Sequence, residues 1–101
     1  MRVELHPEAR AEFRTAAIWY DEREAGLGDA FISDINLTLQ LIAENPPMFP
    51  QWPGAASGIR RAVVSTFPYV IAFEVGPDQI LVLAVAHGRR RPLYWLTRST
   101  R

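Results

Sequence analysis

The stretch AVAHGRRRPLYW, residues 84–95, gathers the side chains of this chain that are best suited to chemistry. An apolar run ends there with one histidine, three consecutive arginines and two aromatic residues, namely His87, Arg89, Arg90, Arg91, Tyr94 and Trp95. The planar guanidinium group suits phosphate, and tyrosine or tryptophan can stack on unpaired bases. A histidine can act as a base near neutral pH. Arg60 and Arg61 form a second basic pair that we expect to converge with this stretch on an anion.

These groups suffice for RNA cleavage without a metal. A base takes the proton of the 2′-hydroxyl, the oxygen attacks the adjacent phosphorus, arginines stabilise the transition state and an acid protonates the leaving oxygen. We expect neither a metal nor a cofactor, because the chain has no cysteine and its histidines and carboxylates lack ligand spacing. Two plainer interpretations stay open. The arginines can form a solvated rim that pairs with acids elsewhere, and Tyr94 and Trp95 can cap the core.

Length and composition predict one globular domain over residues 1–101. The chain is 49% hydrophobic and 22% charged, which is typical of a folded domain. The absence of cysteine excludes disulfide scaffolds and cysteine nucleophiles, and the absence of lysine excludes a P-loop lysine or a Schiff base. No apolar run approaches the roughly 20 residues of a membrane helix, so we expect a cytoplasmic protein without membrane contact.

The zero net charge conceals an asymmetry between the two halves. Residues 1–50 hold four arginines and nine acids, a balance of −5, and residues 51–101 hold seven arginines and two acids, a balance of +5. Such a division favours an anionic ligand on one side of the fold or internal pairing of the two halves.

The first half is predicted to form a strand and a helical hairpin. Residues 2–6 alternate like a half-buried strand, and Pro7 suits a first helical turn. One apolar stripe runs through Ala9, Phe13, Ala16, Ala17 and Tyr20, and a second through Phe31, Ile35, Leu39 and Ile42. Gly26 and Gly28 separate the helices, with Asp29 expected as the N-cap of the second. Residues 45–54 hold four prolines and are predicted to be a loop.

The second half is predicted to be β-structure. Residues 58–66 and 67–75 form two strands, residues 76–79 a turn, and residues 80–86 an apolar central strand. The order is therefore β-α-α-β-β-β, followed by a tail from Pro92. The expected fold class is α+β, with the helical hairpin packed on a small, three- or four-stranded, mostly antiparallel sheet.

Four segments together resemble the RelE/ParE toxins of bacterial type II toxin–antitoxin modules, the plasmid stabilisation proteins. They are HPEARAEFRTAAIWYDEREAGLGDAF, IAENPPMFPQW, IRRAVVSTFPYVIAFEV and ILVLAVAHGRRRPLYW, and the similarity runs from about residue 4 to residue 95. The resemblance implies the same β-α-α-β-β-β order and a growth-inhibiting toxin in a hetero-oligomer with its antitoxin. The C-terminal segment of that antitoxin would wrap the toxin. Apolar side chains off the two stripes would suit this partner, namely Ile18, Trp19, Leu37 and Leu41. Alternatively, these four only pack the helices together.

The resemblance leaves two classes of target. RelE-like members cleave ribosome-bound mRNA, whereas ParE-like members bind DNA gyrase. A nuclease would use Arg61, His87, Arg90 and Tyr94 in catalysis, with Arg60, Arg89, Arg91 and Trp95 binding the anion or target. However, Val63 and Val70 stand where ribosome-dependent nucleases carry cations. This departure favours gyrase over mRNA, while an inactive, antitoxin-binding scaffold is a third possibility.

Overall fold

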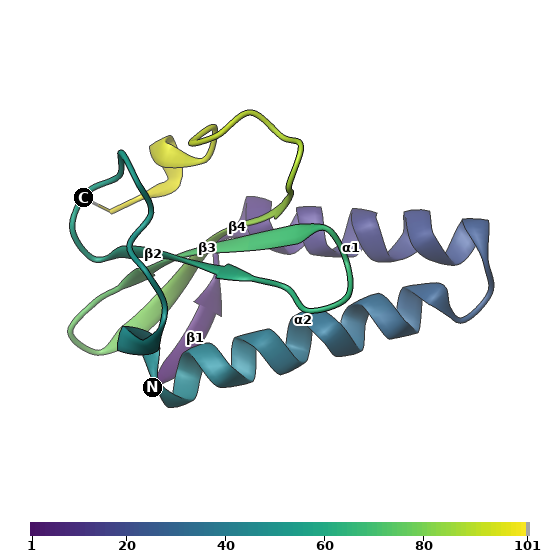
Figure 1. The fold of residues 1–101 in the computed structure, drawn as a ribbon, viewed down its shortest axis with the longest axis horizontal. Helices are drawn as coiled ribbons and strands as arrows, with labels where there is room; N and C mark the ends of the chain where they lie inside the picture. The colour runs from purple at the N-terminus through teal and green to yellow at the C-terminus, as the bar shows by residue number, and fades with distance from the viewer. Residues whose placement is uncertain (101) are drawn as a thin grey trace.

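Two helices cover one face of a four-stranded sheet, and the C-terminal segment crosses the other face (Figure 1). The computed structural model describes residues 1–100; residue 101 of the predicted domain lies outside them. The elements are β1 (Arg2–Leu5), α1 (Pro7–Arg23), α2 (Leu27–Glu44), the 3-10 helix η1 (Pro46–Met48), β2 (Ile59–Val63), β3 (Tyr69–Val75), β4 (Gln79–His87) and the 3-10 helix η2 (Leu96–Arg98). This α+β arrangement confirms the predicted order.

The sheet has the strand order β1-β4-β3-β2. β2, β3 and β4 form an antiparallel meander, while β1 pairs parallel with β4, from Arg2 opposite Gln79 to Leu5 opposite Val82. The predicted mostly antiparallel sheet is thus confirmed, with one parallel pair. β4 is central because its apolar side chains are buried on both faces.

The helical hairpin follows the predicted stripes, but the start of α2 differs from the prediction. Asp29 was expected as the N-cap, whereas α2 begins at Leu27 and its N-cap is Gly26, whose φ is 91°. The capping acceptor comes from α1 instead. Asp21 Oδ1 accepts hydrogen bonds from the amides of Gly26 and Gly28 at 3.0 and 3.1 Å. The Asp21 carboxylate therefore stabilises both the interhelical turn and the start of α2. Asp29 is left exposed in the first turn of α2.

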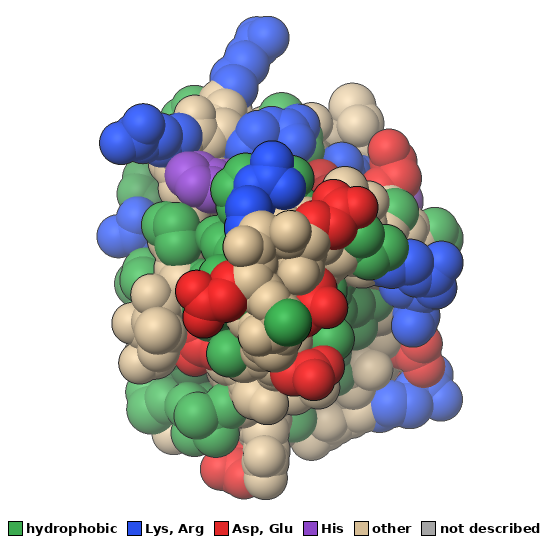
Figure 2. Space-filling view, turned by 90° about the vertical axis from the view of Figure 1, so that its right-hand side faces the viewer, with side chains coloured by type: hydrophobic (Ala, Val, Ile, Leu, Met, Phe, Trp, Pro, Cys, Tyr) green, Lys and Arg blue, Asp and Glu red, His purple; other side chains and the backbone are tan. Residues whose placement is uncertain are grey.

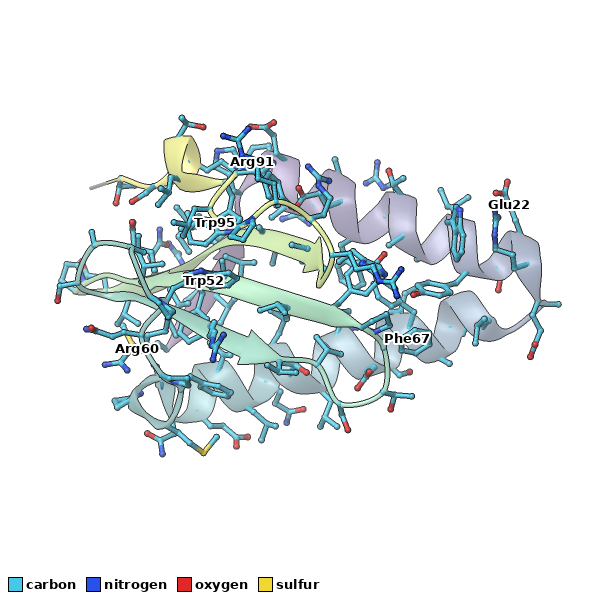
Figure 3. The ribbon with its side chains drawn as sticks, turned by 45° about the horizontal axis from the view of Figure 1, so that its top comes forward. Glu22, Trp52, Arg60, Phe67, Arg91 and Trp95 are labelled. Carbon is cyan, nitrogen blue, oxygen red and sulfur yellow. The ribbon has the colours of Figure 1, made fainter. Side chains whose placement is uncertain are left out.

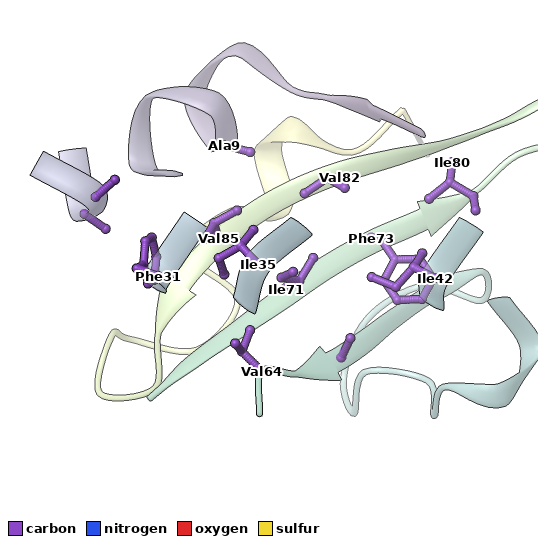
Figure 4. Packing of buried hydrophobic residues seen from close by; sticks show 13 residues of the cluster. Ala9, Phe31, Ile35, Ile42, Val64, Ile71, Phe73, Ile80, Val82 and Val85 are labelled. Carbon is purple, nitrogen blue, oxygen red and sulfur yellow. The ribbon is translucent and has the colours of Figure 1, made fainter. Parts of the chain in front are cut away.

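The main core lies between the hairpin and the sheet (Figure 4). Small residues on α1, among them Ala9, Ala16 and Ala17, let the helix approach closely, and larger side chains of α2 and the strands fill the layer. Phe31, Ile35 and Phe73 are fully buried there. No helix among the described residues is long and apolar enough to cross a bilayer.

A second core covers the opposite face of the sheet. Residues 92–100, here called the C-terminal strap, pack there against the outward-facing side chains of the strands. Trp95 is 1% exposed, and its ring meets the edge of Trp52 at a centroid distance of 4.9 Å (Figure 3). Glu74 on β3 is buried and accepts hydrogen bonds from the hydroxyls of Ser99 and Thr100. The tail is therefore part of the fold.

Candidate functional site

A groove of about 600 Å³ runs between α1 and the C-terminal half of β4. This α1–β4 groove has the size of a ligand pocket, although it is open to solvent. Its lining comes from α1, β3, β4, the turn after β4 and η2, namely Glu8, Ala11, Glu12, Thr15, Ala16, Trp19, Tyr20, Tyr69, Val85, His87, Arg90 and Arg98. Two of the predicted catalytic residues, His87 and Arg90, are among them.

The groove exists because β1 is shorter than β4. Pairing between them ends at Leu5 and Val82, and Pro7 then begins α1. β4 continues to His87 with no strand beside it on that edge among residues 1–100. A side chain replaces one of the hydrogen bonds that a neighbouring strand would form here. Glu12 Oε1 accepts a hydrogen bond from the Val85 amide at 3.0 Å.

Glu12 is also the centre of a polar cluster that fastens the C-terminal strap. Its other oxygen, Oε2, accepts from the Tyr94 hydroxyl at 2.7 Å and lies 3.0 Å from a guanidinium nitrogen of Arg98. Arg98 also donates to the Leu83 carbonyl at 2.9 Å and lies 3.7 Å from Glu8. The side chains of Arg98 and Glu12 are only 9% and 17% exposed. This is a largely desolvated, charge-assisted network.

Tyr94 is held neutral in this cluster. Burial and the hydrogen bond to Glu12 raise the pKa of its phenol well above the ordinary value, despite opposing effects of Arg90 and Arg98. The hydroxyl group of Tyr94 is thus occupied by its hydrogen bond to the Glu12 carboxylate on α1. A predicted catalytic side chain serves here as a fastening of the strap.

His87 lies at the end of β4, and its orientation is fixed by local contacts. Its ring meets the edge of Tyr69 at 5.3 Å, and Nδ1 accepts a hydrogen bond from the Arg89 amide at 3.0 Å. In a neutral imidazole with Nδ1 accepting, the proton resides on Nε2. His87 therefore offers a ligand an N–H donor rather than the lone pair that a general base needs.

The arginines after β4 differ in their contacts. The Arg90 guanidinium lies 4.0 Å from the centre of the Tyr94 ring, a cation–π contact, and forms no ion pair within residues 1–100. Arg89 and Arg91 are exposed in the turn after the strand. The pairing with helix acids that the sequence allowed for these arginines is made by Arg98 instead.

Arg61 lies on the other face of the sheet from His87. Arg61 is opposite Ala72, which belongs to the core beneath the strap, whereas His87 is opposite Tyr69, which packs against the helix-side core. Directly opposed residues share a face, so the two side chains point to opposite sides. Arg60, one residue earlier, points to the helix side and donates to the Phe49 carbonyl at 2.5 Å.

Beside Arg61, the outer face carries the two departures from the nuclease pattern. Val63 and Val70 are directly opposite each other, on the same face as Arg61. Val63 is 70% exposed. Where the resemblance to nucleases would imply further cations, this face carries Arg61 beside two valines.

Trp95 requires a correction as a predicted target-binding residue. It is fully buried against Trp52 and has no surface to offer a base or a partner (Figure 3). The plainer alternative, that it caps the core, describes its position. A large aromatic side chain that follows an exposed turn gains most by returning to cover the sheet.

The four apolar residues assigned to an antitoxin are all exposed, between 41% for Leu41 and 54% for Ile18 and Leu37. None of them belongs to the buried core between the helices and the sheet, and their assignment to the antitoxin stays a prediction. They also do not form one patch. Trp19 lines the α1–β4 groove, Ile18 lies on the side of α1 opposite its buried face, and Leu37 and Leu41 follow each other at one-turn spacing on α2.

The charge asymmetry of the sequence becomes a spatial one. Figure 2 looks onto the end of the helical hairpin, where red side chains gather at the front and blue ones lie mostly toward the top and sides. The exposed acids near this turn are Asp21, Glu22, Glu24 and Asp29. Arg89, Arg90 and Arg91 lie in the turn that follows β4.

Sequence reasoning did not identify Glu12 and Arg98 as site residues. Glu12 is one of several acids on α1, and Arg98 lies in a tail whose state the pattern left open. The one feature of the sequence that hints at their pairing is that the first half of the chain is acidic and the second half is basic. The Cα trace must be known before Glu12 can be assigned to the Val85 amide.

Comparison with known proteins places these features in a family. A family model described as the ParE toxin of type II toxin–antitoxin system, parDE, matches residues 3–92. The chain belongs to the ParE toxin family. A solved structure described as the chromosomal ParDE TA system from P. aeruginosa has a similar fold, with a TM-score of 0.74 and 16% sequence identity. The alignment covers 86% of this chain and 95% of that chain. No curated protein matches significantly.

Membership in the ParE toxin family confirms the expected toxin–antitoxin role and the RelE/ParE type of fold. The matched range includes the helical hairpin, the sheet from Val3 onward and the turn that holds Arg89, Arg90 and Arg91, here called the arginine turn, and it ends at Pro92. The strap with Tyr94, Trp95 and Arg98 therefore lies after the matched residues.

Proposed function

We propose that this ParE-family toxin stops growth by binding DNA gyrase and not by cleaving mRNA. The observation that carries the proposal is the separation of the groups that cleavage requires. Arg61 lies on the outer face of the sheet, and His87 and Arg90 line the groove on the helix side. Groups on opposite faces of one sheet cannot contact a single phosphate, and a misplaced catalytic group costs most of its effect.

The protonation of the remaining candidates supports the same proposal. The Tyr94 hydroxyl donates a hydrogen bond to Glu12, and burial raises the pKa of its phenol, so it is a poor proton carrier near neutral pH. His87 accepts at Nδ1 from the backbone and lacks a free lone pair in its neutral form. General acid–base catalysis needs one group of each kind within reach of the substrate.

The basic turn after β4 is proposed as part of the surface that binds gyrase. Arg89, Arg90 and Arg91 are exposed, adjacent in the chain and without ion pairs among the described residues. Such a group of cations steers association with an acidic partner surface.

The decisive experiment combines two assays. One examines cellular messages after induction of the chain without an antitoxin, and the other measures gyrase activity in the presence of the purified chain. Primer extension on cellular messages is expected to show unchanged 5′ ends, while the purified chain is expected to inhibit DNA supercoiling by gyrase. Replacement of Arg89 and Arg91 by glutamine should weaken that inhibition, whereas the His87→Ala variant should retain it. New 5′ ends inside coding regions that vanish in the His87→Ala variant would refute the proposal in favour of a ribonuclease. Healthy cells with intact messages would refute it in favour of an inactive scaffold.

The antitoxin is proposed to cover the exposed apolar residues of both helices in a hetero-oligomer. Burial of each large apolar side chain is worth about 1.5–3 kcal/mol, so Ile18, Trp19, Leu37 and Leu41 together can anchor a partner. Because they lie on different sides of the hairpin, that partner must wrap it. The double variant Leu37→Glu, Leu41→Glu is expected to fold normally and to lose affinity for the antitoxin in calorimetry. Unchanged affinity would place the antitoxin elsewhere.

A further inference from the structure

The side of α1 that points away from the sheet carries an ordered row of exposed side chains. Arg14, Ile18 and Glu22 follow one another at four-residue spacing, so they form one ridge over two turns of the helix. Ile18 in the middle is 54% exposed, and the buried residues Ala9 and Ala16 lie on the opposite side of α1. Figure 3 shows Glu22 near the end of the hairpin, away from the sheet. This α1 ridge is thus positive at one end, apolar in the middle and negative at the other.

Neither charged end of the α1 ridge has a partner in its own chain. Within residues 1–100, Arg14 and Glu22 form no ion pair. The residues three and four positions from Arg14 are Arg10, Ile18 and two alanines, so no acid pairs with it along the helix. Glu22 lies in the last turn of α1, where the helix dipole favours cations. The two charges therefore have no stabilising partner within their own helix.

A second copy of this chain supplies both missing partners when it lies antiparallel on the α1 ridge. If a two-fold axis passes beside Ile18, residues at equal distances before and after Ile18 face each other. Arg14 is four residues before it and Glu22 is four residues after it. Arg14 of each copy therefore faces Glu22 of the other, and the two Ile18 side chains meet on the axis. Ridges of this spacing are also the ones that interlock in the commonest helix–helix crossing.

The order of the charges favours a second copy over other partners. A uniformly acidic or basic partner would be repelled at one end of the α1 ridge, whereas an antiparallel copy is complementary at both ends. A parallel copy would set Arg14 against Arg14 and Glu22 against Glu22. The chain has no net charge, so two copies do not repel each other as a whole. Ile18 does not line the α1–β4 groove, which stays open in this arrangement.

We propose that two copies of the free toxin associate through the α1 ridge in an antiparallel, two-fold symmetric pair. Arg14 of each copy binds Glu22 of the other, and Ile18 is covered on the axis. Because a single helix crossing buries less area than a stable dimer needs, the pair is weak and forms at high concentration. The inference does not depend on gyrase as the target. An antitoxin that covers Ile18 would separate the two copies.

The first test is sedimentation equilibrium of the full chain without an antitoxin. Between about 10 µM and 1 mM chain in low salt, the average mass is expected to rise from the 11.4 kDa of one chain toward twice that value. Association should weaken in about 0.5 M NaCl, because salt screens exposed ion pairs. A mass of one chain at every concentration would overturn the inference.

Charge reversals test the antiparallel register. Because the axis doubles each change, Arg14→Glu or Glu22→Arg turns both ion pairs into repulsive contacts, and the dissociation constant of either variant should rise at least about tenfold. An equimolar mixture of the two variants should associate as the unchanged chain does, since each reversed residue then meets an opposite charge. Glu44→Arg, at the exposed end of α2, changes the net charge equally and should have no effect. Association that survives in Arg14→Glu, or a mixture that associates no better than its components, would overturn the inference.

A pair of cysteine variants locates the axis. The chain has no cysteine of its own, and a disulfide requires two Cα atoms within about 7 Å. Under mild oxidation, Ile18→Cys should form a covalent pair on a non-reducing gel, because the two positions adjoin on the axis. Thr15 is also exposed but lies three residues from the axis, so Thr15→Cys should stay single at the same concentration. Equal cross-linking of the two variants, or none in Ile18→Cys, would refute the axis at Ile18.

Discussion

Removal of the Glu12 carboxylate is the perturbation whose cost the structure defines best. Glu12→Ala deletes the acceptor of the Val85 amide, the acceptor of the Tyr94 hydroxyl and the main counter-ion of Arg98. Loss of one partner from a buried ion pair typically costs about 3–5 kcal/mol. Glu8, 3.7 Å from Arg98, remains as a second carboxylate, which favours the lower end of that range. We therefore expect the free energy of unfolding to fall by about 3 kcal/mol.

Urea denaturation of the full chain measures this loss, and a surface pair provides the control. Glu4 pairs with Arg2 at 3.4 Å, but their side chains are 47% and 72% exposed, so Glu4→Ala should cost less than about 1 kcal/mol. In thermal unfolding, Glu12→Ala should lower Tm by about 12–24 °C, at about 4–8 °C per kcal/mol for a domain of this size.

A double-mutant cycle separates the ion pair from the other roles of Glu12. Glu12→Ala and Arg98→Met together should cost less than the sum of the two single changes, by about 1–3 kcal/mol, because the second change removes a charge that the first has orphaned. Tyr94→Phe removes a single hydrogen bond to a carboxylate and should cost about 1.5–3 kcal/mol. If Glu12→Ala costs no more than Glu4→Ala, or if the cycle is additive, the carboxylate does not hold the strap and the reasoning fails.

Three further predictions follow from other contacts. Since the fold raises the pKa of the Tyr94 phenol, the unfolded chain loses that proton first as the pH passes the ordinary value of 10.0. The stability should therefore fall above pH 10, and less steeply in Tyr94→Phe, as urea titrations at several pH values can check. A Cβ on Gly28 would lie 2.6 Å from a carbonyl oxygen of α1, so Gly28→Ala should cost about 1–3 kcal/mol in urea denaturation. Gly88→Ala, whose Cβ would be 3.5 Å from its nearest neighbour, is the control, and equal costs would contradict the close helix contact. Asp34 Oδ2 accepts from the amides of residues 66 and 67 at 2.8 and 3.2 Å, so Asp34→Ala should cost about 1.5–3 kcal/mol and speed hydrogen exchange at those amides. Unchanged exchange would show that the loop does not depend on this carboxylate.

The fold was largely predictable because its signals are local. The apolar stripes of both helices, the proline-rich loop and the doubly apolar central strand each depend on short-range periodicity. Strand ends were less accurate. The predicted strand over residues 58–66 is shorter, Ile59–Val63, since Asp34 holds the backbone after it in a loop. Residues 45–54 also contain the short helix η1, which a proline-rich pattern does not reveal.

The candidate site was less predictable because it depends on faces and distant partners. Adjacent residues of a strand point to opposite faces of the sheet, so Arg60 and Arg61 could not both lie beside His87. Arg61 points to the other face, and Arg60 is hydrogen-bonded to the Phe49 carbonyl. The role of Glu12 depends on where β1 ends relative to β4, which no periodicity encodes. Trp95 looked available because an aromatic residue after a polar turn has the same sequence signal on the surface and in the core.

The central position of β4 has a consequence for how the chain can come to be folded. β4 is the last strand in the chain, yet it lies between β3 and β1, so residues 2–5 find their partners only in residues 79–82. Before β4 is synthesised, only the β2–β3 pair can cover the apolar face of the helical hairpin, and β1 has no neighbour. We therefore expect that a piece of the chain without β4 is not a stable domain. We expect a polypeptide interrupted before residue 87 to be unfolded and open to proteolysis, because the strand that joins the two edges of the sheet is then incomplete.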